Sequence, residues 1–137
     1  YHGARFYNDS IASSPSRTIA GLRSFKEKVI LIAGGYDKHI PFDVLGPEIV
    51  EHVKALVLCG ATAGKIRQAV EQAAGYAPGK PEILEVAPFQ NAVEAARDLA
   101  EEGDVVTLSP ACAAFDQFKN FAERGKTFKE IVNSWQE

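Results

Sequence analysis

Hydroxyl and carboxylate side chains gather between the first predicted strand and the first predicted helix. Asp9 and Ser10 follow the predicted strand, and Ser13 and Ser14 precede Pro15, where the helix is expected to begin. Free backbone N–H groups at a helix start favour anions. Capping would need only one of these side chains, which leaves the others without a structural reason. The spacing therefore favours an anion-binding loop over simple capping.

A second candidate loop, residues 34–39, combines paired glycines with Lys38. Glycine lets the backbone approach a ligand closely and adopt positive φ. An ammonium group at the ligand-binding edge of a sheet suits a carboxylate or a phosphate. Read alone, the loop is equally well explained as a glycine turn with Asp37 and Lys38 in water.

Two further loops carry weaker signals. Residues 60–65 are not a phosphate-binding loop, because three residues instead of four separate the glycines and Ile66 follows the lysine. Towards the end of residues 108–121 an aromatic recurs at every third position, at Phe115, Phe118 and Phe121, a pattern more often found in a core than in a ligand pocket. Cys112 has no histidine near it in sequence, so we interpret it as a packing residue. The three histidines, His2, His39 and His52, lack metal-ligand spacing, and no metal site is expected.

The elements that must position these loops alternate between short apolar runs and segments of helical period. Strands are predicted at residues 5–8, 29–33, 55–59, 83–86 and 104–108. Helices are predicted from Pro15, between Phe42 and Lys54, from a Thr62 cap to Gly75, from Phe89 to Gly103, and at the C-terminus from a capping box at Thr127 and Glu130. Continuous apolar strands suit a sheet covered on both faces. The expected fold is α/β: a three-layer, Rossmann-like, doubly wound and mostly parallel sheet with helices on both faces.

Composition bounds the class of protein. The 137 residues allow one domain, and a net charge of −3 argues against a nucleic-acid or anionic-membrane surface. No apolar run is long enough to span a bilayer, and no signal peptide is visible. Cys59 and Cys112 form no Cys-x-x-Cys motif, which fits a reduced, cytoplasmic setting. The absence of methionine, including an initiator, suits a fragment of a larger enzyme.

Residues 108–121, followed by Glu123-Arg124-Gly125, closely resemble the C-terminal signature of the Mur ligases that add D-glutamate. Asn8-Asp9-Ser10 and residues 33–38 occur in the family's order and at its separations. The Asp-Asn-Pro-Arg motif of related ligases that add diaminopimelate or lysine is missing. The resemblance covers essentially the whole chain, and only the long C-terminal motif is highly specific. It implies that residues 1–137 are the C-terminal domain, without the N-terminal UDP-binding and central ATPase domains.

The resemblance also implies a reaction for the full-length enzyme. The expected activity is ATP-dependent addition of D-glutamate to UDP-N-acetylmuramoyl-L-alanine through an acyl phosphate, in peptidoglycan precursor synthesis. ATP and Mg²⁺ would serve the full-length, cytoplasmic and monomeric protein, and the isolated domain would be inactive. Two alternatives stay open: another amide ligase of the superfamily, such as a folylpolyglutamate synthase, or a free-standing flavodoxin-like nucleotide-binding module. A Walker loop upstream in the reading frame would exclude the free-standing module.

Carried over by position, the resemblance assigns roles but no catalytic residue to this domain. Five residues would contact D-glutamate: Ser13, Lys38, Ala114, Phe115 and Phe121. Asp9 and Ser10 would lie on the nucleotide side. Three positions depart from the family: Ile11 replaces a common lysine, Ser14 an asparagine, and Ala114 a serine, so that only the backbone N–H of Ala114 would serve.

Overall fold

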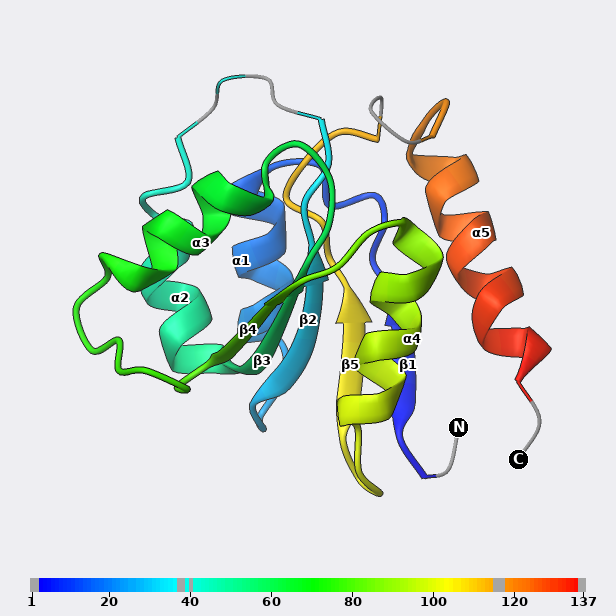
Figure 1. The fold of residues 1–137 in the computed structure, drawn as a ribbon, viewed down its shortest axis with the longest axis horizontal. Helices are drawn as coiled ribbons and strands as arrows, with labels where there is room; N and C mark the ends of the chain where they lie inside the picture. Colours follow the sequence, from blue (N-terminus) through cyan, green and yellow to red (C-terminus); the bar gives the residue numbers. More distant parts are fainter. Residues whose placement is uncertain (1–2, 37–38, 40, 115–117, 136–137) are drawn as a thin grey trace.

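Strands and helices alternate along the chain (Figure 1), and the described residues form five of each. A computed structural model describes residues 3–36, 39, 41–114 and 118–135. In chain order the elements are β1 (Arg5–Asn8), α1 (Pro15–Arg23), β2 (Val29–Ala33), α2 (Leu45–His52), β3 (Val53–Leu58), α3 (Ala63–Glu71), β4 (Glu82–Glu85), α4 (Phe89–Leu99), β5 (Val105–Leu108) and α5 (Phe121–Ser134).

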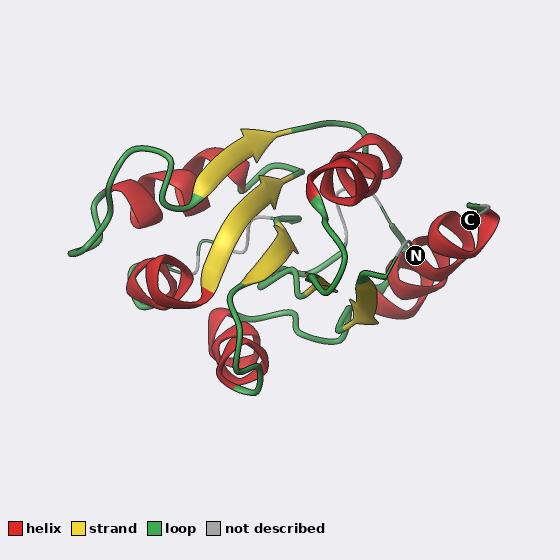
Figure 2. Ribbon diagram, turned by 90° about the horizontal axis from the view of Figure 1, so that it is seen from below, coloured by secondary structure: helices red, strands yellow, loops and turns green. Residues whose placement is uncertain are grey.

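The strands form one sheet in the order β1-β5-β2-β3-β4, and every pairing between them is parallel. Helices α1, α2 and α3 cover one face, and α4 and α5 cover the other (Figures 1 and 2). The predicted three-layer α/β fold with helices on both faces is therefore confirmed.

Strand β2 shows why the apolar runs are continuous. All five of its residues are buried. Leu31 belongs to the cluster beneath α1–α3, whereas Ile30 and Ile32 belong to the cluster beneath α4 and α5. Successive side chains of a strand point to opposite faces, so a strand covered on both sides must be apolar throughout. Each such side chain contributes roughly 1.5–3 kcal/mol as an upper estimate.

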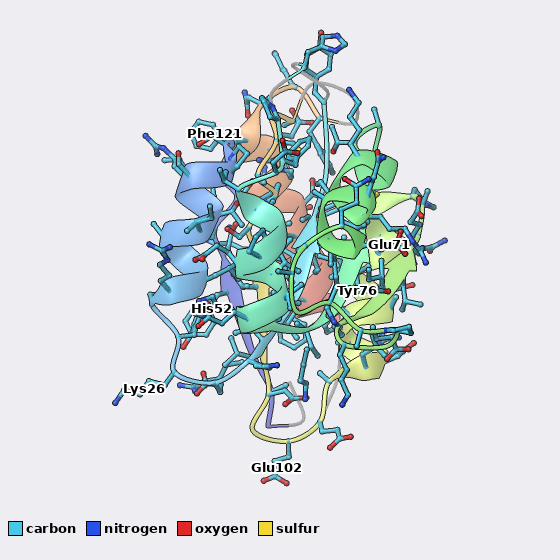
Figure 3. The ribbon with its side chains drawn as sticks, turned by 90° about the vertical axis from the view of Figure 1, so that its left-hand side faces the viewer. Lys26, His52, Glu71, Tyr76, Glu102 and Phe121 are labelled. Atoms are coloured by element: carbon cyan, nitrogen blue, oxygen red, sulfur yellow. The ribbon has the colours of Figure 1, made fainter. Side chains whose placement is uncertain are left out.

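The parallel arrangement collects the carboxyl ends of all five strands at one edge of the sheet. Phe121 lies at this edge and Glu102 at the opposite one (Figure 3). Strands β1 and β5 are neighbours, yet β1 leads into α1 on one face and β5 leads into α5 on the other. Diverging connections of this kind leave a crevice at the sheet edge, where open α/β sheets bind their ligands.

Most predicted boundaries agree with the structure to within two residues, but the last helix was placed wrongly. Helix α5 begins at Phe121, so Thr127 and Glu130 lie inside it and do not cap it. The true cap is Asn120, whose Oδ1 accepts a hydrogen bond from the Glu123 backbone N–H at 2.8 Å. Asparagine is among the strongest N-cap residues.

The predicted starts of α1 and α3 are correct in position, but the predicted side-chain caps do not form. Ser14 and Thr62 occupy the N-cap positions of α1 and α3, and neither side chain makes a capping hydrogen bond. The Thr62 hydroxyl instead accepts from the backbone N–H of Gly35 at 3.1 Å. The predicted stops at Gly75 and Gly103 lie in the turns that follow α3 and α4, which end at Glu71 and Leu99.

Across the described ranges, no helix combines the length and apolarity needed to cross a bilayer.

Candidate functional site

A surface hollow opens between the β1–α1 loop and the β5–α5 loop, at the carboxyl edge of the sheet. The residues around it are Ile11, Ser13, Ser14, Arg17, Ala113, Ala114, Asn120 and Phe121. Three of the residues predicted to contact an amino-acid substrate, Ser13, Ala114 and Phe121, therefore lie together, although they come from opposite ends of the chain. Lys38 and Phe115, the other two, lie outside the described residues.

The rim of this hollow is unusually apolar for a surface. Ile11 is 52% exposed and Phe121 is 44% exposed. Single exposed apolar side chains are common, but here two line the same depression as Ser13 and Ala114. Such a rim can cover the carbon chain of a small ligand while polar groups hold its charged ends.

Arg17 gives the hollow its charge. It is the one cationic side chain among the described residues that line the hollow, and no described carboxylate lines it. Arg17 lies in the first turn of α1, which contains no acidic residue, and the Ser14 hydroxyl contacts the Ser16 hydroxyl at 3.3 Å instead of capping the helix. The local field therefore favours an anion.

Asp9 is held by the end of the neighbouring strand. Its Oδ2 accepts a hydrogen bond from the Ser109 hydroxyl at 2.8 Å. The Thr18 hydroxyl of α1 donates to the Ser109 carbonyl at 3.1 Å. This chain of contacts fixes the ends of β1 and β5 against α1, which gives Asp9 a structural role in addition to the predicted one on the nucleotide side.

Ser10 is buried and is joined to α5. Its hydroxyl donates to the Phe121 carbonyl at 2.7 Å and accepts from Arg124 Nε at 2.9 Å. Arg124 is only 3% exposed, and its Nη1 also donates to the Cys112 carbonyl at 2.8 Å. The guanidinium thus fastens the two loops that form the hollow. Sequence reasoning assigned no role to Arg124, although it lies in the run that carries the family resemblance.

The β2–α2 loop is joined to the same assembly. The Gly34 N–H donates to the Pro110 carbonyl at 2.9 Å, and the Tyr36 N–H donates to the Ala113 carbonyl at 2.8 Å. A Cβ on Gly34 would overlap the Cys59 carbonyl oxygen, and one on Gly35 would lie 2.5 Å from the Ala113 carbonyl oxygen. The paired glycines are therefore required by close packing of backbone.

Both cysteines are buried, as expected for packing residues. Cys59 is 5% exposed and Cys112 is 3% exposed. The Cys112 sulfur lies 3.2 Å from the Thr62 hydroxyl, within the contacts that join the loops after β3 and β5.

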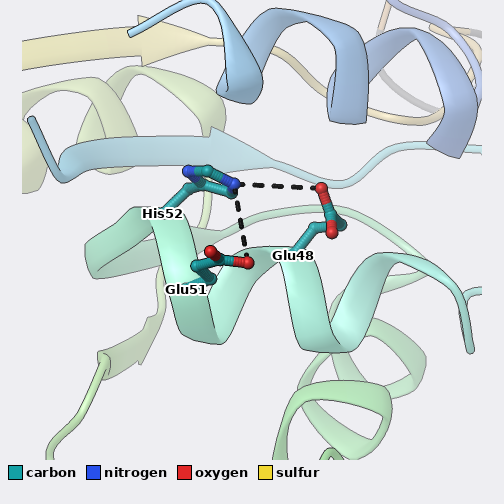
Figure 4. A group of neighbouring side chains, drawn as sticks. All are labelled: Glu48, Glu51 and His52. Carbon is teal, nitrogen blue, oxygen red and sulfur yellow. Dashed lines mark ion pairs between the residues drawn. The ribbon is translucent and has the colours of Figure 1, made fainter. Parts of the chain in front are cut away.

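A group of potential metal ligands lies elsewhere, on α2 (Figure 4). His52 Nε2 lies 3.9 Å from carboxylate oxygens of both Glu48 and Glu51. Glu48 is already paired with Arg23 at 2.6 Å, and this hydrogen bond holds the pKa of the Glu48 carboxyl below its usual value. Because His52 directly precedes β3, the group lies at the amino edge of the sheet, opposite the hollow.

Comparison with known proteins decides the family. Residues 1–112 match the family described as Mur ligase, glutamate ligase domain. The chain belongs to this family. The Mur ligase assignment also extends beyond the matched segment, because the chain is 60% identical over 136 residues to UDP-N-acetylmuramoylalanine--D-glutamate ligase of Acetivibrio thermocellus. It is 55% identical over 133 residues to the ligase of the same name from Clostridium botulinum (strain Okra).

These Mur ligases are much longer than the chain. Each alignment covers 97% of the chain but 29% of the relative. Two solved structures share the fold at low identity. A UDP-N-acetylmuramoyl-L-alanyl-D-glutamate--2,6-diaminopimelate ligase matches with a TM-score of 0.62 and 13% identity, over 96% of this chain and 30% of that one. A domain of a Haemophilus ducreyi protein, described as a UDP-N-acetylmuramate:L-alanyl-γ-D-glutamyl-diaminopimelate ligase, matches with a TM-score of 0.59 and 12% identity, over 97% and 89%.

Proposed function

We propose that this chain is the C-terminal domain of an ATP-dependent ligase that adds D-glutamate to UDP-N-acetylmuramoyl-L-alanine in the cytoplasm. The observation that carries the proposal is the hollow shared by Ser13, Ala114 and Phe121, in a chain whose relatives at 53–60% identity are named for this reaction. The proposal includes two further domains, for the UDP substrate and for ATP, and a monomeric enzyme.

In the proposed reaction, ATP phosphorylates the terminal carboxylate of the UDP substrate to an acyl phosphate. The neutral amine of D-glutamate attacks the acyl carbon, the C–N bond forms, and inorganic phosphate leaves. The task of this domain is to hold the amino acid so that its nitrogen reaches that carbon. The Ser13 hydroxyl and the Ala114 backbone N–H would bind its polar groups, Lys38 would pair with a carboxylate, and Phe115 and Phe121 would cover its carbon chain and exclude water.

In this proposal, ATP and Mg²⁺ would be held chiefly by the other domains of the full-length enzyme. Loop 60–65 lacks the Walker spacing, and the group on α2 lies at the wrong edge of the sheet. When bound in the full-length enzyme, Mg²⁺ would neutralise phosphate charge. We propose that Asp9 and Ser10 serve the nucleotide side by fixing the β1–α1 loop, since their hydrogen bonds hold that loop against β5 and α5.

The test is an amino-acid panel with the purified full-length enzyme, ATP and UDP-N-acetylmuramoyl-L-alanine, measured as phosphate release. D-glutamate should support turnover, whereas L-glutamate, L-lysine and meso-diaminopimelate should not. Lys38→Ala should raise the KM for D-glutamate about tenfold or more, because it removes a charge-assisted contact. Turnover with L-glutamate and a folate acceptor would instead support the folylpolyglutamate synthase alternative.

The non-enzymatic alternative has its own test. A free-standing nucleotide-binding module would bind ATP with the 137-residue chain alone, which titration calorimetry measures. The proposal expects neither tight ATP binding nor ligase turnover from this chain by itself.

A further inference from the structure

We propose that Arg17 binds a carboxylate of the amino-acid substrate and so contributes to the selection of an acidic amino acid. The inference rests on the proposed function and adds to it a residue that neither the family resemblance nor the sequence patterns single out.

Arg17 lies in the same hollow as Ser13 and Phe121. Within the described part of the chain, no hydrogen bond or ion pair engages its guanidinium. The remaining arginines of α1 and α5 behave differently: Arg23 is paired with Glu48, and Arg124 is buried on backbone carbonyls. Among the described residues, Arg17 is therefore the arginine available to a ligand in the hollow.

The composition of the hollow also suits an acidic ligand. A dicarboxylate brings two negative groups, and one cation can neutralise only one of them. No described carboxylate lines the hollow to compete for Arg17. Lys38, proposed for one carboxylate, would leave the other for Arg17, whose planar fork matches carboxylate geometry in a bidentate manner.

A nucleotide phosphate carries similar oxygen anions, but the neighbours of Arg17 favour the amino acid. Asp9 and Ser10, the residues proposed for the nucleotide side, do not line this hollow, and Ser10 is buried. Ser13, Ala114 and Phe121, all proposed for the amino acid, do line it. The position of Arg17 among the second set assigns it to the amino acid.

The experiment measures steady-state kinetics of the full-length ligase with Arg17→Gln and Arg17→Lys, varying D-glutamate and ATP separately. Arg17→Gln keeps most of the side-chain length without the charge and should raise the KM for D-glutamate about 10- to 100-fold. The KM for ATP should stay within about twofold. Arg17→Lys keeps the charge without the fork and should recover part of the loss. Arg5→Gln, an exposed arginine in β1 at the opposite edge of the sheet, is the matched control and should change neither constant.

Each outcome has a defined meaning. An unchanged KM for D-glutamate in Arg17→Gln overturns the inference and leaves the proposed function intact. A raised KM for ATP with an unchanged KM for D-glutamate also overturns it and assigns Arg17 to the nucleotide. If the wild-type enzyme shows no turnover with D-glutamate, the proposed function fails first and the inference fails with it. Circular dichroism melting of the variants excludes unfolding as the cause of a raised KM.

Discussion

Arg124 in α5 donates two hydrogen bonds to Ser10 in the β1–α1 loop. Its Nε lies 2.9 Å from the Ser10 hydroxyl and its Nη2 lies 2.6 Å from the Ser10 carbonyl oxygen. The two residues belong to opposite ends of the chain, and their contact sets the distance between the two loops that form the hollow. The shape of the site therefore depends on a buried arginine that does not line it.

Replacing this arginine should destabilise the domain. Arg124→Met keeps much of the apolar volume but leaves the Ser10 and Cys112 carbonyls without the guanidinium. We expect a loss of about 2–4 kcal/mol in the free energy of unfolding, measured by urea denaturation, because an unsatisfied buried polar group costs about 1–3 kcal/mol. Lys126 is an exposed neighbour in α5, and Lys126→Met should change the free energy of unfolding by less than about 0.5 kcal/mol. A similar small change in Arg124→Met would contradict the fastening role.

Replacing each of two glycines by alanine should change the free energy of unfolding in opposite directions. Gly34 has a φ of +114°, and a Cβ there would overlap a backbone carbonyl that cannot move aside cheaply. Gly34→Ala should therefore lower the free energy of unfolding by at least about 2 kcal/mol. Gly64 lies in α3 with nothing near its Cβ position, so Gly64→Ala should raise it by about 0.5–1 kcal/mol.

Thermal melts of the two variants give the comparison directly. A stable Gly34→Ala protein would show that the β2–α2 loop is not packed as described. Loss of ATP-dependent turnover in an otherwise stable Gly64→Ala enzyme would show that loop 60–65 has a phosphate-binding role after all.

An ion pair at the amino edge of the sheet predicts a pH dependence. Lys54 Nζ lies 2.6 Å from Asp104 Oδ1. Burial raises the pKa of the Asp104 carboxyl, but hydrogen bonds from Lys54 and the Glu101 N–H, with the charge of Lys54, outweigh it and leave the pKa below its usual value. A lowered carboxyl pKa stabilises the fold above the unfolded-state pKa of about 3.9, and this stability is lost as the pH falls through the folded-state value.

Lys54→Met should therefore lower the melting temperature at neutral pH, and its difference from wild type should shrink as the pH falls below about 4. Lys26→Met, at an exposed lysine visible in Figure 3, controls for the loss of a positive charge. A difference that stays constant between pH 7 and pH 2.5 would contradict the assignment. Because the pair lies at the edge opposite the hollow, the KM for D-glutamate should not change.

Strand β2 was predictable because burial on both faces requires an apolar residue at every position. Strand β1 was also placed with its observed bounds, although most of its residues are exposed. The start of α5 was not predicted correctly. Asn120 follows aromatic residues that resemble a core stripe, and Thr127 and Glu130 happen to have capping-box spacing. Two competing caps cannot be ranked without knowing which residues are already helical.

The site was predictable in part. The parallel sheet predicted that loops 9–14 and 109–120 share an edge, and the hollow brings Ser13 and Phe121 together. Strand order, which makes β1 the neighbour of β5, is a long-range property that local patterns do not contain. The burial of Arg124 was unpredictable for a related reason: arginine is rarely buried, and its acceptors are backbone carbonyls that no sequence pattern marks.

The hollow between the β1–α1 and β5–α5 loops is proposed to bind the acidic amino acid. A crystal structure of the full-length enzyme with D-glutamate and a non-hydrolysable ATP analogue is the decisive experiment. We expect glutamate density in contact with Ser13, Arg17 and Phe121. Density elsewhere, for example in the groove between α4 and α5 beside Gln90 and Thr127, would contradict it.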